Sequence, residues 1–168
     1  MKIQITSLSS GRKTRSRDIV EFYIFIAINR KSIKMKKYII AFISCFVSVS
    51  IASIIPTILF YQPEQAELSK LFPGVVNEVP EPLFILISAS ALITLWVITF
   101  DKMGITNLKN GSITGIWFGL LTFTFFGFQF MALTNIVSIQ FALTDIFISG
   151  IMGAIQGGAI GWSLGRFA

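Results

Sequence analysis

The stretch Gly150–Arg166 reads GIMGAIQGGAIGWSLGR and decides how this chain folds. It contains a ladder of glycines, each four residues after the one before: Gly153, Gly157, Gly161 and Gly165. The preceding apolar segment carries a second ladder with the same spacing: Gly111, Gly115 and Gly119. Four residues bring a helix back to nearly the same face, so each ladder forms a strip without side chains. Because such strips let helix backbones meet closely in a bilayer, we predict a tight antiparallel helix pair.

The composition is typical of a membrane protein rather than of a soluble domain. Only 13% of the 168 residues are charged, whereas soluble domains have about 25%. Hydrophobic residues make up 54% of the chain, and the mean hydropathy is +0.76. A chain with so little polar surface has to bury its helices against one another and against lipid. We therefore expect an all-α integral membrane protein.

The apolar runs predict a membrane domain over residues 38–168, preceded by a basic tail over residues 1–37. The domain contains four segments close to the length of about 20 apolar residues that a helix needs to cross a bilayer. These predicted spans cover residues 38–61, 83–100, 111–133 and 145–165. The run Met35-Lys36-Lys37 is also typical of a natural start, so an alternative interpretation places the true start at Met35. The single cysteine, Cys45, is expected to be an inert buried residue.

The distribution of basic residues predicts the orientation in the membrane, because cytoplasmic loops are enriched in lysine and arginine. Ten of the 14 basic residues precede Tyr38: Lys2, Arg12, Lys13, Arg15, Arg17, Arg30, Lys31, Lys34, Lys36 and Lys37. Residues 62–82 contain one lysine, whereas Lys102 and Lys109 lie in the next connection and Arg166 follows the last span. These positions favour both termini in the cytoplasm and a bacterial inner membrane. A basic cluster beside a membrane span indicates orientation, so we expect no nucleic-acid binding.

In this topology both glycine ladders fall in the cytoplasmic half of the bilayer. Bulky rings gather instead at the outer end of the third span: Phe123, Phe125, Phe126, Phe128 and Phe130. We therefore predict a tapered hairpin, pinched at Gly115, Gly119, Gly153 and Gly157 and opening towards Asp145. Besides the bilayer itself, a homo-oligomer or a membrane partner contacting the glycine faces is an alternative use of these strips.

Asp145 is the candidate functional residue. Its role depends on how deep it lies in the membrane. If the last helix begins at Asp145, the carboxylate caps the helix beside the positive end of its dipole. If the helix begins near Gln140, Asp145 lies inside the membrane, where a charge is costly and marks a functional site. The polar side chains predicted to complete such a proton or cation site are Gln129, Thr134, Asn135 and Gln156.

The residue types argue against catalysis. Histidine is absent, which removes the commonest general base and metal ligand, and one cysteine excludes a multi-cysteine metal site. Because Gly111–Gly119 does not follow a strand, a nucleotide-binding loop is not expected either. We expect no catalytic residue, no metal and no cofactor.

The leading functional hypothesis is a small non-enzymatic helix bundle that works as a subunit or homo-oligomer. The alternative is a small transporter or channel with Asp145 as its proton or cation site. A membrane-embedded lipid-modifying enzyme is the third hypothesis, and the missing histidine argues against it.

Overall fold

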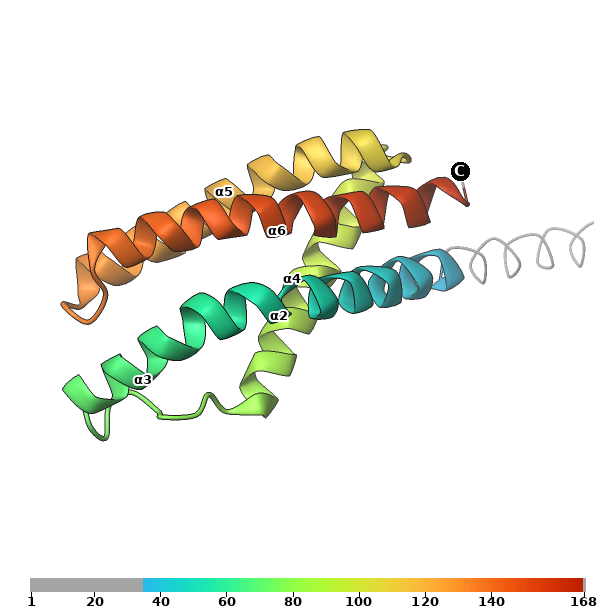
Figure 1. The fold of residues 1–168 in the computed structure, drawn as a ribbon. Coiled ribbons are helices and arrows are strands. Elements are labelled where there is room, and N and C mark those ends of the chain that lie inside the picture. Colours follow the sequence, from blue (N-terminus) through green and yellow to red (C-terminus); the bar gives the residue numbers. More distant parts are fainter. Residues whose placement is uncertain (1–34, 168) are drawn as a thin grey trace, which may run out of the picture. The chain divides into compact units, whose positions relative to one another are not determined.

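A computed structural model of the protein describes residues 35–167, which form helices and short connections without any strand. Four of the helices are long and apolar enough to cross a membrane: the first helix (Met35–Leu71), α4 (Pro82–Lys102), α5 (Leu108–Leu133) and α6 (Ile139–Gly165) (Figure 1). The expectation of an all-α protein with four apolar helices is confirmed. Apart from its last three residues, the predicted basic tail lies outside the described residues.

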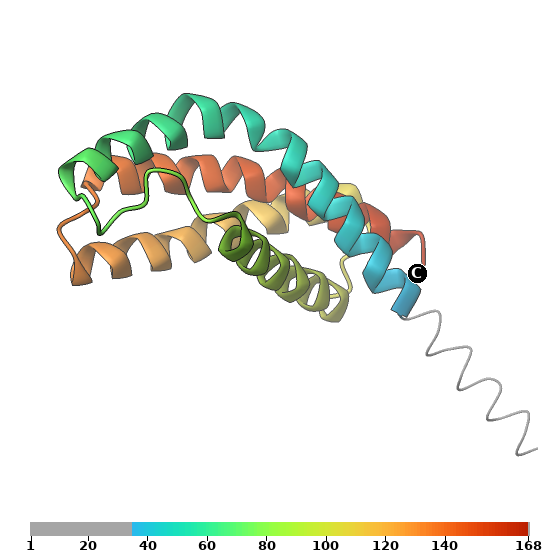
Figure 2. The same cartoon turned by 90° about the horizontal axis from the view of Figure 1, so that it is seen from below.

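The first helix is longer than a bilayer requires. Its 37 residues extend for about 55 Å, whereas the hydrocarbon layer is about 30 Å thick. Its second half comprises α2 (Ile54–Pro56), the π-helical segment η1 (Thr57–Tyr61) and α3 (Gln62–Leu71). The helix bends along its length (Figure 2), as expected where Pro56 removes a backbone donor next to a π-helical segment. The helix therefore continues through α3, ten residues beyond the predicted end of the first span at Tyr61.

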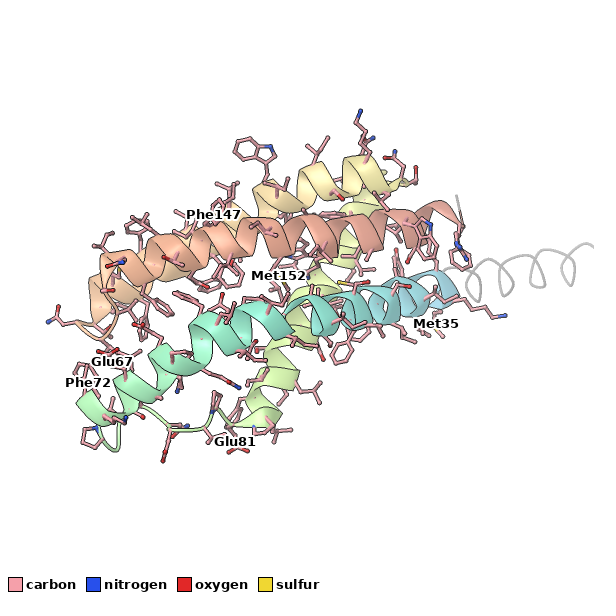
Figure 3. The ribbon with its side chains drawn as sticks, viewed as in Figure 1. Met35, Glu67, Phe72, Glu81, Phe147 and Met152 are labelled. Atoms are coloured by element: carbon pink, nitrogen blue, oxygen red, sulfur yellow. The ribbon has the colours of Figure 1, made fainter. Side chains whose placement is uncertain are left out.

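Charged residues of opposite sign gather at the two ends of the helices. We call one end the basic end, since it holds Lys37, Lys102, Lys109 and Arg166. The opposite end, the acidic end, holds the α5–α6 turn and four of the six acidic residues among residues 35–167: Glu64, Glu67, Glu78 and Glu81. Figure 3 shows Glu67 and Phe72 near each other at the end of α3, and Glu81 apart from them at the start of α4.

α5 and α6 form the predicted antiparallel hairpin, and their backbones touch (Figures 1 and 2). A Cβ atom added at Gly115 would lie less than 3.0 Å from the carbonyl oxygen of Gly153. An added Cβ at Gly111 would similarly meet the Gly157 backbone, and one at Gly119 would meet the Ser149 backbone. Only glycine fits such contacts, so the tight hairpin expected from the ladders is confirmed.

The rest of the glycine-rich face of α6 is covered as well. Gly161 and Gly165 pack against the backbones of Asn107 and Thr106 in the connection before α5. Gly158 faces Ser112 and Leu108, and Gly150 faces Leu120. The two ladders are therefore occupied by packing within the chain, which leaves no glycine strip open for a second protein.

The helices are closer at the glycine ladders than at Gly127, but the rings predicted to hold them apart do not lie between them. Four of the five phenylalanines expected to hold the helices apart are exposed on the outside of α5: Phe125, Phe126, Phe128 and Phe130. A Cβ on Gly127 would lie 3.8 Å from the Cβ of Ala142, which is an ordinary contact between neighbouring helices. The predicted cause of the taper is therefore wrong, because these rings lie on the outside of the hairpin.

The apolar core joins all four helices near the basic end. Its buried members come from the first helix, α4, the α4–α5 connection and α6: Ala41, Cys45, Ile93, Trp96, Val97, Phe100, Ile105, Ile160 and Leu164. Phe118 of α5 packs edge-on against the Trp96 and Phe100 rings, with centroids 5.6 and 5.4 Å away. At the acidic end α4 leaves this core, and every residue of Pro82–Ser88 is exposed. The helices of the bundle are thus tightly packed at the basic end and more loosely packed at the acidic end.

The glycine contacts predict a position-specific effect of adding one methyl group. Gly115→Ala should destabilise the protein by about 1–3 kcal/mol, because the new Cβ collides with the Gly153 backbone and the helices have to move apart. Gly127→Ala, in the same helix, is the matched control: its Cβ has room, and alanine favours a helix. Unfolding by SDS titration in mixed micelles measures both variants, and equal stabilities would contradict the close-contact interpretation.

Candidate functional site

Asp145 lies inside α6 rather than at its beginning. The helix begins at Ile139, and the hydroxyl of Ser138 caps it by accepting a hydrogen bond from the Phe141 N–H at 3.1 Å. Asp145 is about 9 Å further along, at 1.5 Å per residue. Because the influence of the helix dipole fades after the first turn, the interpretation of Asp145 as a helix cap is wrong.

The partner of Asp145 is Tyr61, which the sequence analysis did not identify. The Tyr61 hydroxyl donates a hydrogen bond to Oδ1 of Asp145 at 2.5 Å, and both residues are partly buried. Tyr61 ends the π-helical segment that follows Pro56. Such segments shift the direction of the following side chains and often occur at functional sites. The signal available in the sequence was a proline inside an apolar helix, five residues before a tyrosine.

The polar residues predicted to surround Asp145 lie elsewhere. Gln129 and Asn135 are exposed on the structure's surface, and Thr134 bonds the carbonyl of Phe130 in its own helix. Gln156 is buried, with 8% of its surface exposed, but lies on α6 about 16 Å along the helix from Asp145. Of the candidate residues, only Asp145 and Gln156 therefore face the interior of the bundle.

A mainly apolar chamber lies beside Gln156 and Tyr61. It has a volume of about 180 Å³ and is lined by all four helices, with Trp96 from α4 and Phe123 from α5 among its apolar walls. Its polar lining consists of Ser53, Tyr61, Ser149 and Gln156. Ser149 is 5% exposed, so two of these four polar side chains are more than nine-tenths buried. Tyr61 belongs to the chamber wall and also bonds Asp145, so it connects the chamber to the carboxylate.

Asp145 and Ser149 continue the row of ladder glycines along α6. Each step of four residues turns by about 40° around the helix axis. Three steps from Gly157 to Asp145 therefore turn the row by about 120°, from the face that meets α5 to the face that meets the first helix. The same row of α6 thus packs against α5 at one end and carries polar groups at the other.

The second carboxylate in a span, Asp101, is held differently. It accepts a hydrogen bond from the Tyr38 hydroxyl at 2.6 Å and forms an ion pair with Lys37 at 2.5 Å. This is the only ion pair among residues 35–167, so Asp145 has no basic partner in the described part of the chain. The same residues contain no group of three or more histidine, cysteine or acidic side chains that could hold a metal ion.

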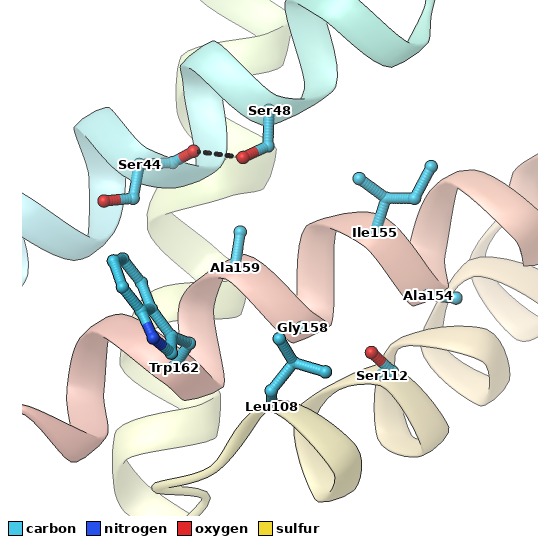
Figure 4. Close-up of a pocket in the computed structure, with 9 residues that line it drawn as sticks. All are labelled: Ser44, Ser48, Leu108, Ser112, Ala154, Ile155, Gly158, Ala159 and Trp162. Atoms are coloured by element: carbon cyan, nitrogen blue, oxygen red, sulfur yellow. Dashed lines mark hydrogen bonds between the residues drawn. The ribbon is translucent and has the colours of Figure 1, made fainter.

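A larger and more open groove lies between the first helix and the α5–α6 hairpin (Figure 4). Its volume is about 480 Å³, and its lining includes the hydroxyls of Ser44, Ser48 and Ser112. Ser48 donates its hydrogen bond to the carbonyl of Ser44 at 2.8 Å, within the same helix. Since the groove contains no ionisable side chain, the chamber beside Tyr61 is the better candidate for chemistry.

The two tyrosine–aspartate pairs should differ in their contribution to stability. Tyr61→Phe should cost about 1 kcal/mol, because it leaves Asp145 without its hydrogen-bond donor inside a membrane span. Tyr38→Phe is the matched control and should cost less, because Asp101 keeps its ion pair with Lys37. SDS titration of both variants measures the difference, and a larger loss in Tyr38→Phe would refute this account of the pairs.

Comparison with known proteins adds no family to this description. No protein-family model, no curated protein and no solved structure matches the chain. The functional proposal therefore depends on the residues and contacts described above.

Proposed function

We propose that this protein is a non-enzymatic integral membrane protein that transports or conducts protons or small cations through a site centred on Asp145. One observation carries the proposal: a carboxylate without a basic partner among the described residues lies within a membrane-spanning helix, bonded to Tyr61. An uncompensated charge in a bilayer costs roughly 2.5–3.5 kcal/mol on insertion scales. A proton or a cation at Asp145 removes this cost, and such residues commonly mark ion pathways.

The proposed topology places the basic end in the cytoplasm and the acidic end outside. Four crossings then bring both termini to the cytoplasmic side of a bacterial plasma membrane. Asp145 and the chamber lie towards the outer face, while the apolar core around Trp96, Phe100 and Leu164 closes the cytoplasmic side. In this arrangement the site is separated from the cytoplasm, and a transported ion has to pass the core.

The topology predicts which introduced cysteines a membrane-impermeant maleimide reaches from outside intact cells. In a Cys45→Ala background, Asn77→Cys in the connection before α4 should react readily, because this position is exposed at the acidic end. Lys109→Cys, exposed at the basic end, should react only after permeabilisation. Labelling of Lys109→Cys but not Asn77→Cys in intact cells would reverse the proposed orientation.

Ion flux into proteoliposomes tests the function directly. Wild-type protein should carry a proton or alkali-cation current above that of empty liposomes, and Asp145→Asn should reduce this flux at least tenfold. Gln129→Leu is a suitable control, since it changes an exposed polar side chain away from the chamber. Wild-type flux no greater than that of empty liposomes, for protons and for alkali cations, would remove the transport proposal.

The second candidate function is a subunit of a homo-oligomer or larger membrane assembly. It is favoured by the acidic half of α4, where Leu83, Phe84 and Ile87 are all more than half exposed and no helix within residues 35–167 covers them. The glycine ladders give it no support, since packing within the chain occupies them. Native mass spectrometry in mild detergent separates the two candidates: a stable oligomer together with absent flux would favour the assembly role.

A further inference from the structure

We propose that the groove between the first helix and the α5–α6 hairpin (Figure 4) binds an anionic phospholipid, with an acyl chain in the groove and the phosphate at Arg166. We call this surface the hairpin groove. The inference goes beyond the transport proposal, because it concerns a different surface and depends neither on Asp145 nor on ion flux. Three features support it: an apolar lining open to the bilayer, a length that matches one leaflet, and a cation at one end.

The hairpin groove suits a hydrocarbon chain better than a polar solute. It has a volume of about 480 Å³ and contains no ionisable side chain. Leu108, Ile155 and Trp162 line it and are each more than a third exposed, so the groove is open along its side. Among its hydroxyls, that of Ser48 is already bonded within its own helix. Because lipid tails are as apolar as leucine side chains, an acyl chain matches this lining.

The hairpin groove is about as long as one leaflet is deep. Its lining on α6 extends from Ala154 to Trp162, which is about 12 Å along the helix. Half of a hydrocarbon layer of about 30 Å is about 15 Å. Its lining on the other two helices belongs to their halves nearer the basic end: Ser44, Ser48, Leu108 and Ser112. The groove therefore lies in the leaflet at the basic end, with Trp162 towards the membrane surface.

Arg166 provides a phosphate-binding group at this end of the groove. Its guanidinium carbon lies 3.9 Å from the centroid of the Trp162 ring, and Trp162 lines the groove. Arg166 forms no ion pair with an acidic side chain of residues 35–167. A guanidinium donates paired hydrogen bonds to phosphate, and tryptophan at the end of a span lies at the depth of the lipid headgroups. A phosphate bound there leaves the acyl chain of the same lipid beside the groove.

The surrounding charge favours a lipid with a net negative charge. Lys109 is exposed and directly follows Leu108 of the groove lining. A Cβ added at Gly165 would meet the Thr106 backbone, so the start of α5 and the end of α6 share one corner of the bundle. Lys109, like Arg166, forms no ion pair among residues 35–167. Basic groups in such positions attract anionic headgroups, whereas a zwitterionic headgroup brings an ammonium that they repel.

Two other apolar grooves, both between the first helix and α4, lack this charge pattern. One has a volume of about 330 Å³ and includes Tyr38, whose hydroxyl bonds an Asp101 carboxylate already paired with Lys37. The other has a volume of about 530 Å³ and extends to Pro82, directly after the exposed Glu81. A neutralised pair or a carboxylate does not attract an anionic headgroup, so the charge distribution favours the hairpin groove.

Native mass spectrometry of the full chain tests the headgroup preference with phosphatidylglycerol and phosphatidylcholine of identical acyl chains. The wild type should bind its first phosphatidylglycerol about tenfold more tightly than phosphatidylcholine. Arg166→Gln should remove most of this preference, because it deletes the phosphate-binding group. Lys102→Gln, the matched change at an exposed basic residue at the end of α4, should keep it. Equal affinity of the wild type for both lipids, or equal loss in both variants, would overturn the proposal.

A second pair of variants tests the acyl chain. Ala159 lines the groove (Figure 4), so Ala159→Phe should fill it and weaken phosphatidylglycerol binding about tenfold. Ala91→Phe, at an exposed position of α4, is the matched control and should bind as the wild type does. Unchanged binding in Ala159→Phe would overturn the acyl-chain site. A dimer that Ala159→Phe disrupts, without any lipid preference, would instead assign the groove to a second copy of the chain.

Glycerophosphoglycerol, the same headgroup without acyl chains, provides the test that remains if Ala159→Phe does not fold. It should bind the wild type at least tenfold more weakly than phosphatidylglycerol, because the groove then holds no chain. Equal binding of the free headgroup and the whole lipid would overturn the proposal, since it would leave a phosphate site without any contribution from the groove.

Discussion

The backbone contact between α5 and α6 is the constraint on which the rest of the structure depends. In a bilayer, apolar side chains gain little by leaving lipid for another helix, so close packing has to supply the association energy. Gly111, Gly115 and Gly119 supply it by meeting the backbone of α6 without any intervening Cβ. This contact holds one face of α6 against α5. Because a helix is rigid, it also determines the directions in which the other faces of α6 point. Asp145, Ser149 and Gln156 are then held towards the first helix by a rigid hairpin rather than by their own hydrogen bonds.

Two hydrogen-bonded tyrosine–aspartate pairs connect the first helix to α4 and α6. Tyr38 bonds Asp101 of α4, and Tyr61 bonds Asp145 of α6. The two tyrosines are about 35 Å apart along the helix, close to the hydrocarbon thickness of about 30 Å. The pairs look alike but differ in charge, since Lys37 neutralises Asp101 and no described basic residue pairs with Asp145. Charge balance therefore distinguishes the two pairs, because Asp101 is neutralised by Lys37 whereas Asp145 has no basic partner among the described residues.

The helices pack tightly near the basic end of the bundle and more loosely near the acidic end. Near the basic end, Trp96, Phe100 and Leu164 are almost fully buried and their contacts join all four helices. Near the acidic end, α4 leaves its neighbours, and the first helix contains Pro56 and a π-helical segment. Weakly packed, irregular segments open at lower free energy than tightly packed ones. The chamber lies at the boundary between these two regions, with Trp96 on its sealed side and Tyr61 on its looser side.

The sequence by itself determined the architecture: hydropathy predicted four apolar helices, and the four-residue glycine spacing predicted the antiparallel hairpin. Both signals are local, because a helix face repeats at fixed spacing whatever surrounds it. The tertiary structure alone decided the site. Pairing of Tyr61 with Asp145 joins residues 84 positions apart in the chain and depends on where Pro56 and the π-helical segment turn the first helix. The outward direction of Phe125, Phe126, Phe128 and Phe130 was likewise decided by how α5 packs on α6, which no pattern within one helix reveals.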